Sequence, residues 1–182
     1  MGCGSLRGGR LFIPYLLPGH YFGIEPAQWL VREGFERELG QDMQRVKWPN
    51  FHHGNDFQLS VFGRSFDFII AQSIFSHAAT CQIRRCLSEA AKVMKPRAIF
   101  AATYFEASED YSGTEWVYPE CVGYTFEHLI GLAREQGLAC ARLNWPHPNG
   151  QQWVVFFRQG LARISEGLLS AVATSAVPGG GR

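Results

Sequence analysis

The chain opens on a glycine-rich stretch, Gly2-Cys3-Gly4-Ser5-Leu6-Arg7-Gly8-Gly9, which runs directly into the apolar residues Leu11, Phe12 and Ile13. This is the pattern of a tight loop that leads into a helix. Glycine allows the backbone of such a loop to approach a ligand closely, because no Cβ stands in the way. The loop amides and the first helical turn supply hydrogen-bond donors and partial positive charge. The stretch therefore predicts a binding loop for an anionic group, such as a carboxylate or a phosphate.

An acidic residue follows at a spacing typical of nucleotide-binding folds. Residues 20–25 form a short run of strand length that ends in Glu25, about 20 positions after Gly4. In Rossmann-type folds an acid at this place binds the ribose hydroxyls. Either feature alone is equally typical of an ordinary turn or an exposed strand end. Together, in a chain of alternating strands and helices, they favour a nucleoside cofactor.

Apolar runs of strand length alternate with helical periodicity, which predicts an α/β fold. We expect a Rossmann-like, mostly parallel sheet with helices on both faces. Asn149-Gly150 is turn chemistry, so the last two strands are predicted to form an antiparallel C-terminal hairpin. The predicted strands are residues 20–25, 66–72, 99–104, 138–145 and 153–158.

Three helices are predicted from apolar stripes and from the residues that begin or end helices. The first ends at Gly40, the second covers residues 80–93 with Thr80 as its N-cap, and the third lies between Thr125 and Gly137. Residues 1–159 are predicted to form one domain. Residues 160–182, which are rich in Ala, Ser, Gly and Val, are predicted to be a flexible tail.

Composition narrows the function classes. The chain of 182 residues has 17 Lys and Arg against 16 Asp and Glu and no long run of either sign, so nothing indicates a nucleic-acid or anionic-lipid partner. Five cysteines without a C-x-x-C pair indicate reduced thiols. There is no run of about 18 apolar residues and no signal-peptide pattern, which predicts a cytoplasmic protein without a membrane segment. The histidines show no H-E-x-x-H pattern, so no metal is expected, and no oligomeric state is indicated.

The glycine stretch resembles the G-C-G motif of class I S-adenosylmethionine-dependent methyltransferases, and Gly23-Ile24-Glu25-Pro26 is similar to the acid that ends their second strand. The dinucleotide spacing G-x-G-x-x-G would need a glycine where Arg7 stands, whereas the wider spacing to Gly8 fits the methyltransferase motif. Residues 66–77 resemble their fourth strand and the loop after it. Lys95-Pro96-Arg97-Ala98 resembles the K-P-G-G turn before their fifth strand, with both glycines replaced. The resemblance covers roughly residues 1 to 158.

The resemblance implies S-adenosylmethionine as the cofactor. Asp56 and Phe57 stand where the family contacts the adenine, although Gly54-Asn55-Asp56 is also turn chemistry and this alternative stays open. Gln72 and Ser73 fall where the predicted strand of residues 66–72 ends and are expected to face the ligand crevice of the sheet. The implied cofactor-binding residues are Gly2, Cys3, Gly4, Ser5, Gly8, Glu25, Pro26, Asp56, Phe57, Gln72 and Ser73.

His77 is the candidate catalytic residue. Its imidazole could accept a proton from a hydroxyl or amine acceptor as the methyl group arrives, and a structural role at a helix start is the alternative. The long segment of residues 105–124 carries both aromatic and acidic side chains. It is expected to be a lid over a small-molecule substrate of polar or cationic character.

The family's first strand should directly precede the glycine stretch, yet only Met1 stands there. The sequence therefore predicts an N-terminally truncated domain without its central strand, at a cost expected to exceed the roughly 5–15 kcal/mol that stabilises a domain. The main hypothesis is an active small-molecule methyltransferase. An inactive methyltransferase-like domain or truncated product that serves as a binding module stays open as an alternative. An NAD-dependent oxidoreductase is disfavoured by Arg7 and by the predicted hairpin.

Overall fold

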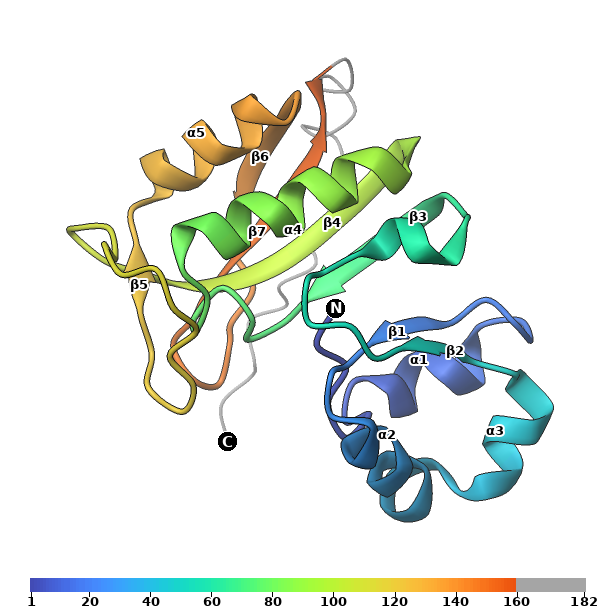
Figure 1. The fold of residues 1–182 in the computed structure, drawn as a ribbon. Helices are drawn as coiled ribbons and strands as arrows, with labels where there is room; N and C mark the ends of the chain where they lie inside the picture. The colour runs from blue at the N-terminus through green and yellow to red at the C-terminus, as the bar shows by residue number, and fades with distance from the viewer. Residues whose placement is uncertain (160–182) are drawn as a thin grey trace, which may run out of the picture.

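The computed structural model describes residues 1–159, in which the strands form two separate sheets (Figure 1). The small sheet pairs β1 with β2, and the large sheet has the order β3-β4-β7-β6, with β5 beside the end of β4. The strands are β1 (Phe22–Ile24), β2 (Asn50–His52), β3 (Phe66–Ala71), β4 (Met94–Glu106), β5 (Gly123–Tyr124), β6 (Leu138–Leu143) and β7 (Gln152–Arg158).

Strand direction follows the prediction. The pairs β1–β2, β3–β4 and β4–β5 are parallel, whereas β7 runs antiparallel to both β4 and β6. The C-terminal hairpin thus inserts its last strand between β4 and β6. This arrangement confirms the α/β fold with a Rossmann-like parallel part and an antiparallel end.

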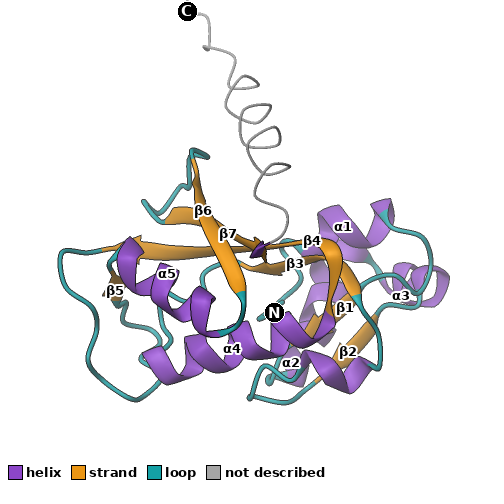
Figure 2. Cartoon of the chain, turned by 90° about the horizontal axis from the view of Figure 1, so that it is seen from above, coloured by secondary structure: helices purple, strands orange, loops and turns teal. Residues whose placement is uncertain are grey.

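The helices lie on both sides of the sheet layer. Figure 2 shows α4 and α5 against one side of the large sheet and α1 on the opposite side of the layer. The helical elements are α1 (Gly9–Tyr15), α2 (Gln28–Gly34), the π-helical turn η1 (Phe35–Leu39), α3 (Gln41–Lys47), the 3₁₀ turn η2 (Leu59–Phe62), α4 (Thr80–Val93) and α5 (Phe126–Glu135).

Helix α4 has the predicted bounds because its apolar stripe is buried. Ile83, Leu87 and Ala90 recur on one face and are fully buried in the main core. The predicted N-cap is wrong by one residue: Ala79 occupies the N-cap, and its amide donates to Gln82 Oε1 at 2.8 Å. The hydroxyl of Thr80 lies instead 3.1 Å from His128 Nε2 on α5.

The other two predicted helices begin and end as their boundary residues indicate. Gly40 ends the π-helical turn after α2 with a φ of 82°, and Gly137 follows α5 with a φ of 69°, values that favour glycine. Thr125 is the N-cap of α5, and its hydroxyl accepts a hydrogen bond from the His128 amide at 3.1 Å.

Strand β4 is longer than predicted. The segment expected to be a turn, Lys95 to Ala98, belongs to β4, where the pairing with β3 shifts from Phe66 opposite Met94 to Phe68 opposite Ile99. The extra residues are accommodated as an irregularity of the ladder and not as a separate turn. Helix α3 was not predicted, and it has no buried residue that would give an apolar stripe. The strands β2 and β5 were not predicted either, because two or three residues show no readable strand period.

The buried apolar residues of the described part of the chain form three clusters. The largest, the main core, lies between the large sheet and helices α4 and α5 and also includes Ile24 of β1. The second contains Leu6, Ile13, Val31 and Phe35, and a small third one contains Leu143, Val155 and Phe157 of β6 and β7. Among the described residues no strand lies between β1 and β3. The first residues join the two sheets: the Met1 amino group donates to the Ile70 carbonyl at 2.5 Å, and the Cys3 amide donates to the Ile24 carbonyl at 3.1 Å.

The flexible tail predicted for residues 160–182 lies outside the described residues. Within residues 1–159 no helix is long and apolar enough to cross a membrane.

Candidate functional site

The glycine stretch forms a tight loop between the two sheets. Gly2 and Gly4 have φ values of 63° and 50°, in the left-handed region that favours glycine. A Cβ on Gly2 would lie 2.1 Å from Ile74 Cδ1, so this glycine allows the loop to touch the segment after β3. A Cβ on Gly4 would meet no atom within 4 Å, so the loop is open on that side. The loop can therefore receive a ligand beside Gly4.

Glu25 fastens the loop to the end of β1. Its carboxylate oxygen Oε2 accepts a hydrogen bond from the Gly4 amide at 2.9 Å, and Oε1 accepts one from the Ala27 amide at 3.1 Å. The residue is only 9% exposed, and hydrogen bonds to an ionised carboxylate are stronger than those to neutral groups. Each oxygen can accept a further hydrogen bond. Glu25 can thus order the loop and still receive ligand hydroxyls.

His53 also contacts Glu25 at the end of β1, and this residue was not predicted from the sequence. Its Nδ1 lies 2.7 Å from the Glu25 carbonyl oxygen, and the Glu25 amide donates to the His52 carbonyl at 3.0 Å. A carbonyl can only accept, so Nδ1 carries the proton in this contact. The signal available in the sequence was weak, because β2 is only three residues long.

The segment after β3 lies next to the loop through Ile74. Ser73 has a φ of 54°, and its amide donates to the Thr103 hydroxyl at 2.7 Å. Gln72 is exposed, and its Nε2 lies 3.2 Å from His147 Nε2 in the loop between β6 and β7. The structure therefore brings Gln72 and Ser73 to the same end of the sheet as the glycine loop.

His77 is half-buried and held in a defined orientation. Its Nδ1 lies 2.6 Å from the Glu120 carbonyl oxygen, so Nδ1 carries a proton in this contact, and in the neutral imidazole the free lone pair is then on Nε2. The rings of Trp116 and Tyr118 lie 5.7 and 5.2 Å from the imidazole, centroid to centroid. The Cys121 thiol is 4.0 Å from Nδ1. An imidazole oriented in this way can accept a proton at Nε2.

The long segment after β4 is fixed to the protein at its far end. The Val117 amide donates to the His77 carbonyl at 3.0 Å, and the Val122 amide donates to the Ser76 carbonyl at 2.8 Å. The Thr125 amide donates to Asp110 Oδ1 at 2.8 Å. These bonds place the aromatic side chains of the predicted lid beside His77.

Asp56 and Phe57 lie outside the glycine loop and the end of β1, and their side chains make other contacts. Asp56 is exposed, with Oδ1 3.3 Å from the Gln58 amide and Oδ2 3.7 Å from Arg85 NH2 on α4. Phe57 has a φ of 58° and packs against the main core. The carboxylate of Asp56 thus takes part in turn chemistry, the alternative that the sequence left open.

The remaining predicted residues surround the loop. Burial raises the pKa of the Cys3 thiol to about 11, so this cysteine stays protonated at neutral pH. Ser5 lies against α2, where a Cβ on Gly34 would be 2.6 Å from the Ser5 carbonyl oxygen. Gly8 occupies the N-cap of α1, and Pro26 is exposed just after Glu25. All of them belong to the glycine loop or to the end of β1.

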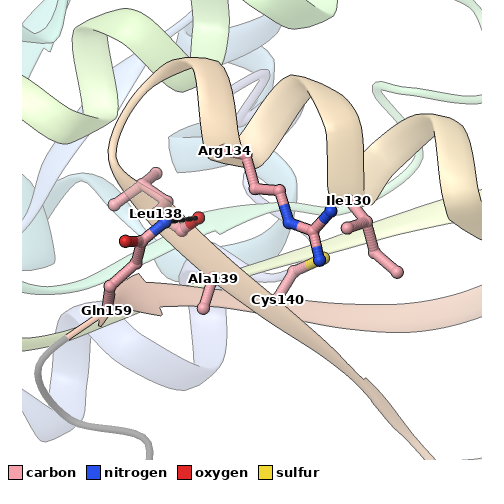
Figure 3. Close-up of a pocket in the computed structure, with 6 residues that line it drawn as sticks. All are labelled: Ile130, Arg134, Leu138, Ala139, Cys140 and Gln159. Atoms are coloured by element: carbon pink, nitrogen blue, oxygen red, sulfur yellow. Dashed lines mark hydrogen bonds between the residues drawn. The ribbon is translucent and has the colours of Figure 1, made fainter.

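A cavity of about 240 Å³ lies elsewhere, at the edge formed by α5, β6 and the end of β7 (Figure 3). None of the residues predicted for the site lines it. Its lining residues are Ile130, Arg134, Leu138, Ala139, Cys140 and Gln159. Within residues 1–159 no group of three His, Cys, Asp or Glu side chains could hold a metal ion.

Two solved structures with a similar fold are named as methyltransferases. Magnesium protoporphyrin IX methyltransferase from Synechocystis PCC 6803, solved with bound SAH, matches with a TM-score of 0.63 at 13% identity over 87% of this chain and 71% of that chain. The CcbJ methyltransferase from Streptomyces caelestis matches with a TM-score of 0.66 at 12% identity, over 86% of this chain and 81% of that one. At these identities the likeness shows the fold. No curated protein matches the chain.

A family model described as a methyltransferase domain matches residues 1–102, which hold the glycine loop, Glu25 and the segment after β3. This match covers more than half of the chain. It agrees with the fold of the solved structures and with the loop fastened by Glu25. The chain belongs to the methyltransferase domain family, which confirms the class I S-adenosylmethionine-dependent methyltransferase predicted from its glycine motif.

Proposed function

We propose that the chain transfers a methyl group from S-adenosylmethionine to a small-molecule acceptor. The observation that carries the proposal is the 2.9 Å hydrogen bond from the Gly4 amide to Glu25 Oε2, because it joins the glycine loop to the acid at the end of β1. The two segments are 21 positions apart in sequence, and their meeting point is where this fold binds a nucleoside.

The residues present fit this cofactor. The open side of Gly4 leaves room for an amino-acid group against the loop, and the remaining lone pairs of Glu25 suit ribose hydroxyls. The cofactor supplies an activated methyl group on a sulfonium. Gln72 and Ser73 would line the same site from the segment after β3, and Asp56 would reach the adenine only after leaving its contact with Arg85.

The protein's own part in the reaction is positioning and removal of a proton. Holding two reactants in the correct geometry accounts for much of the rate of such transfers. His77 is proposed as the general base for a hydroxyl or amine acceptor, because its Nδ1 proton is bound by the Glu120 carbonyl and Nε2 keeps a lone pair. Trp116 and Tyr118 beside it would contact the body of an acceptor.

A small acceptor is supported by the names of similar structures. The Synechocystis enzyme is named for magnesium protoporphyrin IX, which is a small molecule, and another match is a complex of LepI with SAH and a substrate analogue. These names describe those proteins alone. For this chain, the proposed acceptor class is supported by the aromatic side chains of Trp116 and Tyr118, which lie beside His77.

Calorimetry with S-adenosylhomocysteine and with NAD tests the proposal. We expect binding of S-adenosylhomocysteine and none of NAD, and release of S-adenosylhomocysteine when S-adenosylmethionine is supplied with an accepted phenol or amine. His77→Asn keeps an N–H donor for the Glu120 carbonyl but has no base, so transfer should fall by about 10²-fold or more while cofactor affinity stays the same. Binding of NAD alone would refute the proposal. Binding of S-adenosylhomocysteine without transfer to any acceptor would favour an inactive binding domain.

A further inference from the structure

We infer that Thr103 and Gln151 are positioning residues that hold the segment after β3 in the conformation the cofactor site needs. The inference rests on the proposed function, because Gln72 and Ser73 are proposed to bind the cofactor. Neither Thr103 nor Gln151 belongs to the glycine loop or to the acid at the end of β1. Both come from the large sheet, on β4 and directly before β7.

Ser73 is held in an unusual backbone conformation. Its φ of 54° lies in the left-handed region, which residues other than glycine rarely adopt. Strand β3 ends at Ala71, opposite Ala102 of β4, so the chain leaves the ladder just before Ser73. The Ser73 amide then finds its acceptor in a side chain, the Thr103 hydroxyl at 2.7 Å. Because Thr103 is fully buried, this acceptor has a fixed position.

Gln151 holds the side chain of the same serine. Its Nε2 donates to the Ser73 hydroxyl oxygen at 3.0 Å, and the residue is only 5% exposed. The other amide atom, Oε1, is buried without a hydrogen-bond partner among the described residues. A buried acceptor without a partner costs stability. A leucine would fill this space without that cost. We therefore attribute the role of the Gln151 amide to its hydrogen bond with the Ser73 hydroxyl.

A strained backbone that neighbouring residues hold in place is typical of functional sites. Here the restraint comes from a distant part of the chain: Thr103 pairs with Trp153 of β7, and Gln151 precedes that strand by one residue. The contact between Gln72 and His147 at 3.2 Å adds a second connection from the same hairpin. The C-terminal hairpin therefore sets the position of the segment after β3, and through Ile74 it reaches the glycine loop at Gly2.

The test compares four variants by two measurements, affinity for S-adenosylhomocysteine by calorimetry and thermal unfolding without ligand. Thr103→Val removes the acceptor of the Ser73 amide with little change in shape, and Gln151→Leu removes the donor to the Ser73 hydroxyl. Both should weaken binding by about tenfold, the loss expected for one displaced hydrogen-bonded contact. Thr103→Ser keeps the hydroxyl and should bind like the wild type.

Thr125→Val is the matched control, because it also removes a threonine hydroxyl that accepts from one backbone amide, at the start of α5. It should lower the melting temperature and leave the affinity unchanged. Gln151→Leu should show the opposite pattern, with unchanged or raised stability and weaker binding, since it also removes the buried Oε1. Substitution of a purely structural residue would not weaken the affinity for S-adenosylhomocysteine while leaving the thermal stability unchanged or raised.

The outcomes distinguish this inference from the proposed function. If the wild type does not bind S-adenosylhomocysteine, the proposed function fails. If the wild type binds and both Thr103→Val and Gln151→Leu bind as tightly, the inference is wrong and the proposed function stands. If Thr103→Val does not fold, Gln151→Leu decides, and a loss of stability with unchanged affinity would overturn the inference.

Discussion

Glu25 connects two segments of the chain with one buried carboxylate. It accepts from the Gly4 amide in the loop and from the Ala27 amide just after β1, and both donors belong to backbone that no ladder satisfies. The sequence could indicate that an acid stands here. Only the structure shows that the same carboxylate accepts hydrogen bonds from both segments and so orders the loop.

Glu25→Gln should weaken both the fold and the cofactor site. An amide has a single acceptor oxygen and turns a donor toward one of the two backbone amides, so we expect a loss of about 1–3 kcal/mol in unfolding free energy. Affinity for S-adenosylhomocysteine should fall by a similar free energy. Urea unfolding and calorimetry measure the two effects. Glu36→Gln is the control, because Glu36 is exposed and the same charge is removed; an equal effect of both changes would contradict the role of Glu25.

Helix α4 is joined to the turn η2 by a second buried carboxylate. Glu89 is 1% exposed, and its oxygens accept from the Ser60 amide at 3.2 Å, the Ser60 hydroxyl at 2.8 Å and Lys92 Nζ at 2.6 Å. Burial alone would raise the pKa of the carboxyl, but the hydrogen bonds from Lys92 and Ser60 outweigh it, and the pKa of Glu89 is lowered. The charged form is therefore the one that stabilises this contact.

Because the pKa is lower in the folded state, Glu89 stabilises the protein above the pKa of the unfolded chain, and this contribution is lost as the pH falls through the folded-state pKa. Glu89→Gln should cost about 1–3 kcal/mol of unfolding free energy at pH 7, and the difference from the wild type should shrink toward zero in acid. Urea unfolding of both proteins at a series of pH values, from pH 7 into the acid range, measures this difference in unfolding free energy. A difference that is constant with pH would contradict it. Glu135→Gln, which breaks an exposed pair with Arg84, should cost much less.

The molecule as a whole contains two sheets of unequal size, and we expect them to differ in stability. The large sheet has a continuous core with α4 and α5, whereas β1 and β2 are three residues each; Ile24 of β1 reaches the main core, and Phe51 of β2 packs against the smaller cluster. Two-stranded sheets are only marginally stable by themselves. The bonds from Met1 to Ile70 and from Cys3 to Ile24 are backbone connections between the two parts.

We therefore expect β1 and β2 to open without the rest of the protein. Their amides should exchange with solvent deuterium at least about tenfold faster than the hydrogen-bonded amides of β4 and β7, because a sheet of two three-residue strands is held by few ladder hydrogen bonds. Hydrogen exchange followed by NMR measures the difference residue by residue. Equal opening free energies in both sheets would contradict it, and added S-adenosylhomocysteine should slow exchange in β1, since the ligand would bridge the two parts.

Local patterns determined the elements whose signals lie within a few residues. The alternation of apolar runs, the glycines of the opening stretch, Asn149-Gly150 and the boundary residues Thr125, Gly40 and Gly137 each specify a backbone geometry directly, so the α/β fold and the final hairpin could be predicted. Short elements such as β2 could not, since three residues show no period. The extension of β4 through Lys95 to Ala98 was missed for another reason, because that segment resembles the K-P-G-G turn of the family.

Tertiary structure decided which side chains meet in the site. The sequence by itself determined that a glycine loop and an acid are present and that the chain has the methyltransferase fold. Contacts such as His53 with Glu25 and Thr103 and Gln151 with Ser73 join residues 28, 30 and 78 positions apart. No local propensity encodes such pairs, because they form only when the small sheet pairs β1 with β2 and the large sheet brings the end of β3, β4 and the start of β7 together. The residues of the opening stretch predict the loop that is proposed to bind the cofactor. The packing of the sheets decides which contacts fix the position of that loop.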